Sequence, residues 1–569
     1  MSSSSLFSLL ALITLLTSST STSSAAAPTP SLVILGINTN IPAYTNLSST
    51  YVSTNIDAAS LAAGMDFSDP LLTNMLRQMG DVELRVGGTS AHGLIWTGEP
   101  GMPCGCCGPS ARGAVYLSTE CFDSLGAFLV NSNTSLLFDF SAEREDIGNM
   151  SSPWNSTTAR NLFAYVADKP YAQHLVAWEI GNEDSDTITT GEQLGRDLLT
   201  LQKLALSYNL STRIVGPSLP KMAYTETWLE GFMNATHGKL DRFAYHLYGG
   251  VDCKDVSGWS FISRETYQGW GKDVDNWVNC ESGYGGEKGG ERENTHTHKV
   301  TTYRLIPPSP TPPPPPSPDR NEGFLAESTG IFVEETASTP IGGCINASDR
   351  FIDGFFWMTI IGLPGEHGGN QINRQDLAGW SFLGRVSHYE LVGIPGWVNA
   401  TQDGPALPHP DWFTTVLWKQ IMGNSILNVT SITGGGASNV TIHTFCTSTT
   451  AGMPRGSISL GIVNAALTSI EIQIPSMASL VPRTEFILTA TANMFAATGT
   501  NQSDTSLPKE LWDDAIYLNG ILMTVDKDGN LPSFPIKGNH VTVATTTLNF
   551  PPLSYGFVIL EGAQSAACM

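Results

Sequence analysis

The sequence predicts an α/β domain, a (β/α)8 barrel, followed by an all-β domain, an antiparallel β-sandwich. Strand-like apolar runs alternate with helical patterns as far as about residue 400. From about residue 425 the runs become short, alternating and rich in Thr and Val, with turn residues between them. A length of 569 residues accommodates a barrel of about 250 residues and a smaller domain. We expect the barrel over 28–420 and the sandwich over 421–569.

The N-terminus reads as a signal peptide over residues 1–27. Residues 6–16, LFSLLALITLL, are an apolar run followed by Ser, Thr and Ala residues that suit signal peptidase. The run is too short to span a bilayer, and no later stretch reaches about 18 apolar residues, so we expect no membrane span. Eleven Asn-x-Ser/Thr sequons fit a secreted glycoprotein of the cell wall, cell surface, lysosome or vacuole: Asn46, Asn133, Asn149, Asn155, Asn209, Asn234, Asn346, Asn399, Asn428, Asn439 and Asn501.

Six apolar runs predict barrel strands, and two further strands are inferred to complete eight. The runs are 82–88, 135–142, 175–183, 212–218, 242–250 and 330–335. The run SLVILGINTN at 31–40 also reads as a strand, and it could join either the barrel or the sandwich.

A Gly/Pro-rich insertion is expected over 280–322. It contains IPPSPTPPPPPSPD, which favours an extended polyproline II arm on the surface. His296 and His298 lie in this tract, and we expect them to be solvated rather than metal ligands.

The nine cysteines predict several disulfides in an oxidising compartment, with pairing left open. Cys104, Cys106 and Cys107 match no zinc spacing, and their Gly/Pro surroundings predict a stapled loop. We therefore expect no metal and no organic cofactor.

The charge balance excludes one class of partner. Lys plus Arg total 29 against 52 for Asp plus Glu, a formal net charge of -23 that repels polyanions. Nucleic acid is therefore not an expected partner, whereas a glycan is compatible with this charge. The sequence does not indicate an oligomeric state.

Two predicted strands end in carboxylates. VAWEIGNED, residues 176–184, contains Glu179 inside the strand and Glu183 at its end, and GIFVEETAST places Glu334 and Glu335 at the end of another. Barrel enzymes carry their chemistry at the carboxyl ends of the strands. Two carboxylates facing one cavity are what glycosidic bond cleavage requires. We expect Glu179 to be a buried structural carboxylate.

These motifs resemble the heparanase-like glycosidases, glycoside hydrolase family 79. WEIGNE followed by a later ETAS strand carries the resemblance, together with LRVGGTS (84–90) and YHLY (245–248). EETASTPIGGCINASDRFIDGFFW, NRQDLAG and PDWFTTVLWKQIMGNSIL extend it into the sandwich. The resemblance covers nearly the whole mature chain except the proline-rich insertion.

The resemblance implies a retaining glycoside hydrolase. Glu183 is then similar to the acid/base, Glu335 to the nucleophile and Asn182 to the residue that holds the sugar 2-hydroxyl. Glu327, in FLAES, is a rival nucleophile, but it would demand an eight-residue insertion before SDRF. The other residues implied to bind substrate are Arg85, Thr89, His246, Tyr248, Gly342, Gly343 and Gln375.

One departure from the family concerns the substrate. The family holds a uronate carboxylate with amides of a Gly-rich turn, preserved as Gly342 and Gly343, and with a tyrosine after the Arg-Gln strand. At that place this chain has GWSFLGR, so Trp380 or Phe382 supplies a ring without a phenol. The loss of one charge-assisted hydrogen bond, about 1.5 to 3 kcal/mol, would weaken uronate selectivity.

The function expected first is an exo-acting β-glucuronidase of cell-wall or extracellular glycans. The chain lacks the basic clusters that a sulfated polyanion such as heparan sulfate would require. Two alternatives stay open. One is another retaining activity, such as an arabinofuranosidase or β-glucanase, and the other is a catalytically silent carbohydrate-binding wall glycoprotein.

Overall fold

The computed structural model describes residues 29–569 with gaps at 101–113, 185–187, 221–224, 238, 256, 264–265, 268–329, 383–384, 395–406, 478–480, 494–506, 543–544 and 546. Several sequence-based expectations therefore lie outside the described residues. They are the signal peptide, the Cys104–Cys107 loop, the proline-rich insertion with its two histidines, the rival nucleophile Glu327 and the side chain of Phe382.

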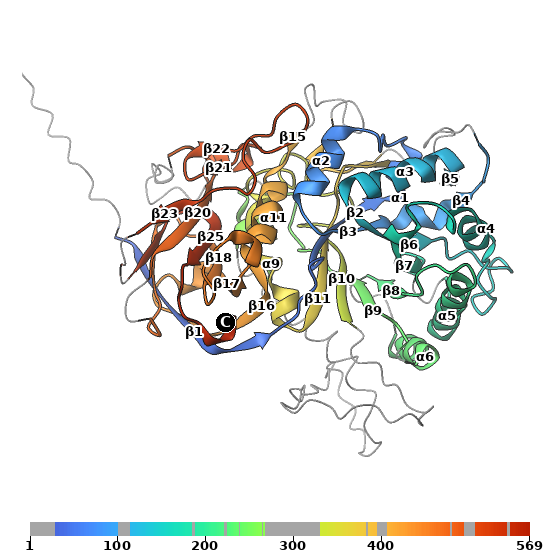
Figure 1. The fold of residues 1–569 in the computed structure, drawn as a ribbon, viewed down its shortest axis with the longest axis horizontal. Coiled ribbons are helices and arrows are strands. Elements are labelled where there is room, and N and C mark those ends of the chain that lie inside the picture. Colours follow the sequence, from blue (N-terminus) through green and yellow to red (C-terminus); the bar gives the residue numbers. More distant parts are fainter. Residues whose placement is uncertain are drawn as a thin grey trace, which may run out of the picture.

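Eight parallel strands form a nearly closed barrel, as predicted (Figure 1). The order is β7-β6-β3-β2-β11-β10-β9-β8, and a parallel bridge between Trp178 and Ile214 brings the two edges together. The strands inferred without a clear sequence signal are β2 and β11. The bounds are β2 (Val52–Asp57), β3 (Glu83–Gly87), β6 (Ser135–Phe140), β7 (Leu175–Ile180), β8 (Val215–Leu219), β9 (Arg242–His246), β10 (Gly330–Thr336) and β11 (Gly369–Arg374).

The barrel strands are apolar because they are covered on both sides. β10 is buried at all seven positions and β3 at all five, as expected for parallel strands enclosed by helices. An apolar layer inside the barrel contains Leu137, Ala177, Val215, Ala244 and Phe332, from five different strands. Polar residues follow toward the carboxyl ends of these strands.

Helices cover the outside of the barrel, with α3 to α6 along its edge away from the sandwich (Figure 1). Ser118, Thr190 and Thr225 cap α3, α5 and α6 by accepting backbone N–H groups. No helix in the described ranges is long and apolar enough to cross a membrane. The bounds are α1 (Ala58–Ala62), α2 (Pro70–Gln78), α3 (Thr119–Ser132), α4 (Thr157–Val166), α5 (Gly191–Ser207), α6 (Glu226–Thr236), α7 (Trp259–Ile262), α9 (Asp353–Ile360), α10 (Leu363–Glu366) and α11 (Pro410–Ile421).

Short paired strands lie in the barrel loops. They are β4 (Leu94–Trp96) with β5 (Val115–Leu117), β12 (Ser381–Phe382) with β13 (Arg385–Val386), and β14 (Val392–Gly393) with β15 (Leu407–Pro408).

An eleven-stranded, mainly antiparallel sheet forms the second domain and curls around its own apolar core. The first strand of the described chain, β1, belongs to this sheet because it pairs with β16 and β19. The bounds are β1 (Ser31–Tyr44), β16 (Met422–Thr433), β17 (Val440–Thr447), β18 (Ile458–Asn464), β19 (Ile470–Gln473), β20 (Arg483–Thr489), β21 (Tyr517–Leu518), β22 (Ile521–Leu522), β23 (Asn539–Val541), β24 (Leu548–Phe550) and β25 (Ser554–Leu560).

The two domains share one core, and α9 and α11 lie between them (Figure 1). Trp418 of α11 packs edge-on against Phe445 and Phe557 of the sandwich. Arg374, at the end of β11, pairs with Asp353 of α9 at 2.7 Å and Asp411 of α11 at 2.8 Å. These buried contacts fix the barrel against the sandwich on the side opposite α3 to α6.

Candidate active site

Glu183 and Glu335 lie at the carboxyl ends of β7 and β10. Glu183 is three residues beyond β7 and has a left-handed backbone, φ +58°, with its N–H donating to the carbonyl of Ser218 at 2.8 Å. Such a conformation is costly for a residue other than glycine, and it is typical of functional sites. Glu335 is the penultimate residue of β10 and is 5% exposed.

The two carboxylates face each other across a short gap. One oxygen of Glu183, one oxygen of Glu335 and a ring nitrogen of His246 all lie within 4.8 Å of one another. Retaining glycosidases separate their carboxyl groups by about 5 to 5.5 Å, whereas inverting enzymes need about 6.5 Å or more to admit a water molecule. The spacing in this site falls on the short side of that division.

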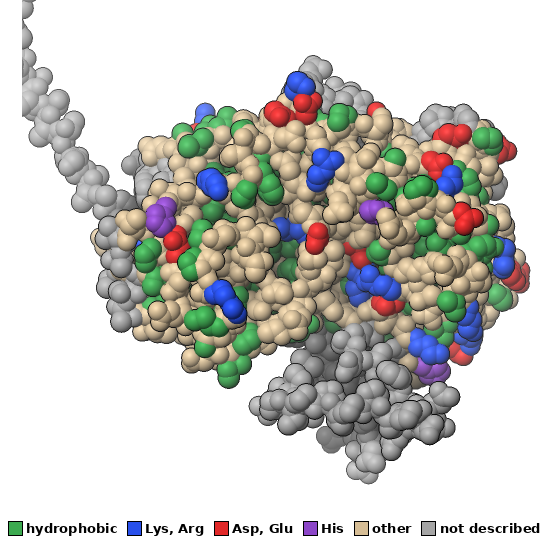
Figure 2. Space-filling model, in the orientation of Figure 1, with side chains coloured by type: hydrophobic (Ala, Val, Ile, Leu, Met, Phe, Trp, Pro, Cys, Tyr) green, Lys and Arg blue, Asp and Glu red, His purple; other side chains and the backbone are tan. Residues whose placement is uncertain are grey.

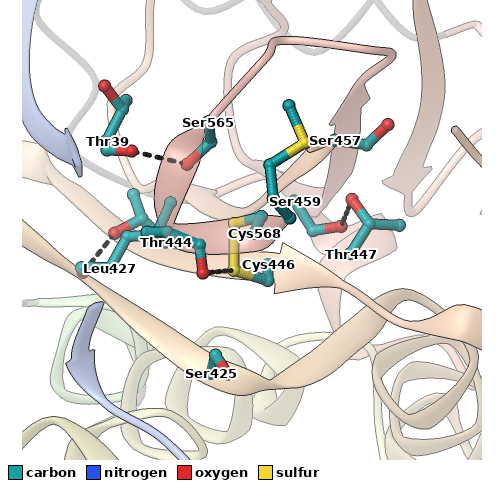
Figure 3. Close-up of a disulfide and its surroundings, with 12 residues drawn as sticks. Thr39, Ser425, Leu427, Thr444, Cys446, Thr447, Ser457, Ser459, Ser565 and Cys568 are labelled. Atoms are coloured by element: carbon teal, nitrogen blue, oxygen red, sulfur yellow. Dashed lines mark hydrogen bonds between the residues drawn. A yellow bond between two sulfur atoms is a disulfide. The ribbon is translucent and has the colours of Figure 1, made fainter. Parts of the chain in front are cut away.

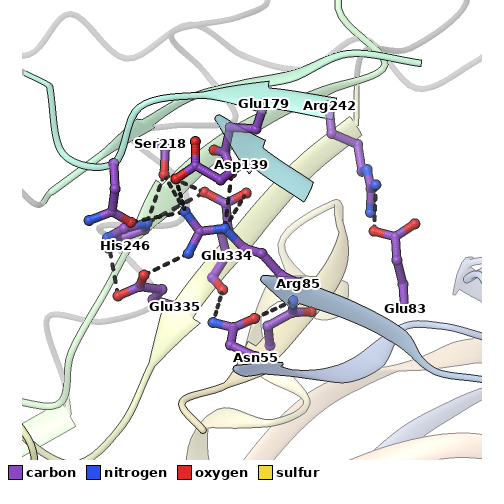
Figure 4. A network of polar contacts seen from close by, with 12 residues as sticks. Asn55, Glu83, Arg85, Asp139, Glu179, Ser218, Arg242, His246, Glu334 and Glu335 are labelled. Atoms are coloured by element: carbon purple, nitrogen blue, oxygen red, sulfur yellow. Dashed lines mark hydrogen bonds and ion pairs between the residues drawn. The ribbon is translucent and has the colours of Figure 1, made fainter. Parts of the chain in front are cut away.

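Arg85, from β3, holds the nucleophile candidate from inside the barrel (Figure 4). It donates to Glu335 at 2.6 Å, to Glu179 at 2.9 Å and to the side-chain oxygen of Asn182 at 2.9 Å. Arg85 is 0% exposed, so it cannot reach a sugar in this conformation. In this conformation Arg85 positions the carboxylates and Asn182, and the substrate contact that the resemblance implied for it stays a prediction.

Three further carboxyl groups lie behind Glu335, and burial together with Arg85 and His246 gives them different protonation states. Burial raises the pKa of Asp139 and Glu179 well above the usual range, although Arg85 opposes this effect. Burial would also raise the pKa of Glu334, but Arg85 and His246 together lower it to about 2. The barrel interior therefore holds protonated acids next to one ionised carboxylate.

His246, the last residue of β9, lies between the two catalytic candidates. Its Nδ1 is 2.8 Å from Glu183 and 3.5 Å from Glu335, and its Nε2 is 3.0 Å from the hydroxyl of Ser218. Burial lowers the pKa of His246, but the neighbouring carboxylates, Glu335 first, outweigh burial and raise the pKa to about 10. The imidazole is therefore a buried cation in the free protein.

Tyr248, two residues beyond β9, donates from its phenol to Glu335 at 2.7 Å. Burial, followed by the charge of Glu335, raises the pKa of this phenol well above 10. The phenol of Tyr248 therefore keeps its proton, and can donate a hydrogen bond, at neutral pH. Arg85 and Tyr248 bind different oxygens of Glu335 and together fix the plane of its carboxylate.

A turn of residues 341–343 packs against Tyr389, near these carboxylates. All three have positive φ, +62°, +92° and +83°, which favours glycine at the last two positions. A β-carbon at Gly343 would lie 3.0 Å from the Cβ of Tyr389, and Gly342 accepts from the N–H of His388. Tyr389 is 2% exposed, accepts from Trp380 at 3.2 Å, and has its pKa raised by burial and by nearby carboxylates that include Glu335.

Comparison with known proteins places this geometry in a family. Over 466 residues, 79% of this chain and 69% of the relative, the sequence is 23% identical to "Heparanase" of Bos taurus. It is 21% identical over 546 residues, 90% and 87% of the two chains, to "Heparanase-like protein 1" of Arabidopsis thaliana. Residues 45–304 match the model of "Glycosyl hydrolase family 79, N-terminal domain". The N-terminal part of the chain is therefore similar to glycosyl hydrolase family 79, and the likeness to heparanases and heparanase-like proteins extends over most of its length.

The protein is a glycoside hydrolase, and its fold agrees with solved glycosidases. A 4-O-alpha-L-rhamnosyl-beta-D-glucuronidase from Fusarium oxysporum aligns with a TM-score of 0.57, covering 93% of this chain and 100% of that one, at 11% identity. A GH51 alpha-L-arabinofuranosidase from Thermotoga petrophila aligns with a TM-score of 0.53 over 93% of this chain and 100% of that one, at 12% identity. Likeness at these identities concerns the fold alone.

Thr89 and Gln375, two further residues expected in the site, stay predictions, and the backbone N–H of Gln375 donates to the carbonyl of Thr336, next to Glu335, at 2.9 Å. Thr89 is exposed at the start of the 3-10 helix η1 (Thr89–Gly93). Gln375 is 2% exposed, and its side-chain oxygen accepts from Asn55 of β2 at 2.8 Å.

The expectation that only a ring without a phenol, Trp380 or Phe382, lies by the glycine turn is wrong, because Tyr389 packs against Gly343. The sequence following the Arg-Gln strand was read only as far as Trp380 and Phe382, but the chain turns through β12 and β13 and brings Tyr389 back against Trp380. Because this hairpin reverses the chain, Tyr389 was not recognised from its position in the sequence.

Asp57 is a second residue that sequence reasoning missed. It ends β2 and caps α1, and its Oδ2 lies 2.3 Å from a β-carbon built on Gly88. Burial, opposed by its bond to the N–H of Ala59, raises the pKa of Asp57 to about 6, and Glu335 adds to that rise. Its place at the carboxyl end of a barrel strand was the available signal, but this strand was only inferred.

Glu183, His246 and Glu335 also present atoms close enough to coordinate a metal ion. The charges around them oppose a cation. Arg85 already binds Glu335 at 2.6 Å, and His246 carries its own proton, because its pKa is raised to about 10. A divalent ion would have to displace two positive groups. The donor set therefore fits proton transfer better than metal binding.

Proposed function

We propose that the protein is a secreted, retaining β-glucuronidase. The observation that carries this proposal is the turn at Gly342 and Gly343, packed against Tyr389 beside the close pair Glu183 and Glu335. Backbone N–H groups and a phenol are neutral donors suited to one sugar carboxylate. Acting on terminal glucuronosyl groups is favoured over cutting a sulfated chain.

The chemistry follows double displacement. Glu335 attacks the anomeric carbon while Glu183 donates a proton to the leaving glycosidic oxygen, giving a covalent glycosyl-enzyme. Glu183, which is ionised again once it has passed its proton on, then takes a proton from water, which attacks the anomeric carbon and releases Glu335. Asn182 precedes Glu183, its side-chain oxygen accepts from Arg85, and its proposed role is to bind the 2-hydroxyl.

The proton that Glu183 needs is stored on His246. Burial would raise the pKa of Glu183, but the hydrogen bond and charge of His246 lower it, so the free carboxyl is ionised. The charge of Glu335 is the leading cause that keeps His246 protonated. As Glu335 forms its ester with the sugar, that charge disappears and the imidazolium becomes more acidic. As the attack proceeds, the proton passes along the 2.8 Å contact from His246 to Glu183 and on to the leaving oxygen, and the proton that Glu183 later takes from water returns to His246.

The surface charge supports a small acidic group rather than a polyanion as substrate. On the face shown in Figure 2, described Lys and Arg side chains are scattered singly or in small groups, interspersed with Asp and Glu. With a net charge of -23, the chain does not attract a sulfated polymer at long range. A single uronate that is bound by short-range hydrogen-bond donors is compatible with this negative net charge.

Two features support secretion. Bridges join Cys253 to Cys344 and Cys446 to Cys568, and such bonds persist in oxidising compartments. Eight of the nine sequon asparagines within the described ranges are exposed, and the ninth, Asn155, is partly exposed. Glycosylation at these positions would not disturb the core.

The test is hydrolysis of a chromogenic β-glucuronide beside the matched glucoside, galactoside and arabinofuranoside. The protein should turn over the glucuronide, and Glu335→Gln should abolish this while Glu327→Gln, the rival position, retains it. Activity confined to arabinofuranoside or glucoside would replace the proposed substrate with a neutral sugar. Absence of activity on the whole panel would favour a silent carbohydrate-binding protein.

A further inference from the structure

The bridge between Cys253 and Cys344 lies at the edge of the candidate active site. Cys344 directly follows Gly343, and Cys253 is five residues beyond Tyr248. The bridge therefore joins the loop after β9, which carries the phenol bound to Glu335, to the loop after β10, which carries the glycine turn.

These two loops already run side by side before they reach the bridge. The N–H of Gly249 donates to the carbonyl of Ala337 at 2.9 Å, and the N–H of Val251 donates to Ser338 at 3.0 Å. This pairing extends the β9–β10 ladder beyond the ends of both strands. The disulfide links the two loops just beyond these hydrogen bonds, next to the glycine turn.

The turn itself has little apolar anchoring. Ile341 and Ile345, on either side of the two glycines, are each 68% exposed. Two adjacent glycines have more backbone freedom to lose than any other pair of residues. The local restraints are polar or covalent. The N–H of Cys344 donates to the hydroxyl of Ser348 at 2.9 Å, His388 donates to Gly342, and the bridge fixes Cys344, which is 3% exposed.

We propose that the bridge between Cys253 and Cys344 is a positioning device for the substrate carboxylate. It holds the amides of Gly342 and Gly343 against Tyr389, so that these donors are already in place when the sugar binds. This inference rests on the proposed glucuronidase function. Preorganised donors strengthen binding because the cost of ordering them has been met during folding.

The catalytic carboxylates are held by contacts that do not require the bridge. Glu335 belongs to β10, where Arg85 binds one of its oxygens, and Glu183 is held by the backbone of Ser218 and by His246. Tyr248 lies five residues before Cys253, and the backbone pairing of the next residue, Gly249, with Ala337 fixes it without the bridge. Release of the bridge should therefore weaken glucuronide binding while the chemical step continues. In kinetic terms, KM should rise while kcat is retained.

The experiment compares Cys253→Ser/Cys344→Ser with a matched control, Cys446→Ser/Cys568→Ser. The control bridge ties the C-terminus to β17 in the sandwich (Figure 3). Both bridges join Cα atoms 5.2 Å apart, and they enclose 91 and 122 residues, so their chain-entropy contributions to stability are comparable. KM and kcat for 4-nitrophenyl β-glucuronide and the melting temperature are measured for both variants.

We expect KM to rise about five- to tenfold in the active-site variant, because loosening the turn weakens a charge-assisted hydrogen bond to the substrate without removing it. The value of kcat should stay within about twofold of wild type. The sandwich variant should lose thermal stability without a change in KM. Equal changes in both variants, an unchanged KM, or a fall in kcat alone would overturn the proposal. Wild-type protein that does not cleave the glucuronide would instead refute the function on which the proposal rests.

A second variant keeps the test decisive if the double variant does not fold. Ser348→Ala leaves the bridge in place and removes the acceptor of the Cys344 N–H. It should raise KM for the glucuronide by about two- to fivefold and leave kcat unchanged. If KM is unaltered in Ser348→Ala and the double variant cannot be folded, the proposal that this restrained turn controls glucuronide binding is wrong.

Discussion

Replacement of Arg85 by methionine tests whether one buried cation organises the active site. The guanidinium lies inside the barrel at 0% exposure, and the substitution removes its charge and hydrogen bonds while keeping an unbranched apolar side chain. Four carboxyl groups lose their partner, at 2.6, 2.9, 3.3 and 3.8 Å: Glu335, Glu179, Glu334 and Asp139. We expect both stability and activity to fall.

The magnitude follows from the number of charges left behind. Removing one partner of a buried ion pair costs about 3 to 5 kcal/mol, because the remaining charge is uncompensated. Burial already raises the pKa of Asp139 and Glu179, so those two can stay neutral. The cost then falls mainly on Glu334, whose pKa is lowered to about 2 chiefly by Arg85 against burial, and on Glu335. We expect a loss of about 4 kcal/mol near neutral pH.

The loss should depend on pH with a defined sign. A carboxyl that loses Arg85 has a raised pKa in the folded state, so the folded variant binds more protons than its unfolded chain. Its free energy of unfolding must therefore fall as pH rises above about 4. The difference between wild type and Arg85→Met should be smaller near pH 5 than near pH 7.5.

Urea unfolding at these two pH values measures the effect, with Arg242→Met as the matched control. Arg242 is also buried, at 5% exposure, and it pairs with Glu83 at 2.5 Å at the start of β9, away from the catalytic end (Figure 4). The control should lose about 3 kcal/mol but keep kcat, whereas Arg85→Met should lose at least about 100-fold in kcat. A loss below about 1 kcal/mol in Arg85→Met, or the same loss at both pH values, would refute the reasoning.

Three further predictions concern catalysis, substrate binding and stability. Glu183→Ala should cleave an activated dinitrophenyl glucuronide about 10²- to 10⁴-fold more slowly, and azide should restore turnover and give the β-glycosyl azide; an α-product would contradict retention. Tyr389→Phe should raise KM for the glucuronide at least about tenfold, while Tyr248→Phe should mainly lower kcat, and steady-state kinetics with the reverse pattern would exchange their roles. Asp57 and Glu390 have pKa values raised by burial to about 6 and about 8, so the folded state binds more protons than the unfolded state. The free energy of unfolding should therefore decrease by at least about 2 kcal/mol from pH 5 to pH 8, and a melting temperature that rises over this range would count against that assignment.

The barrel and its catalytic end were predictable because the relevant signals are local. A run such as GIFVEE is apolar because both faces of its strand are covered, and the polarity changes where the strand leaves the sheet. Once a barrel is recognised, that rule makes Glu183, Glu334 and Glu335 candidates, and the resemblance to a glycosidase family selects Glu183 and Glu335 among them. β2 and β11 gave weaker signals, and Asp57 was missed along with the first of them.

What the sequence by itself determined is the fold class and which residues end the strands, since a strand records its burial in its own composition. Only the tertiary structure decided which side chains meet. It turned Arg85 inward to the carboxylates, returned Tyr389 through a hairpin to the glycine turn, and paired Cys253 with Cys344 across 91 residues. These contacts join segments far apart in the chain, and their geometry comes from packing and loop closure, which no local pattern encodes.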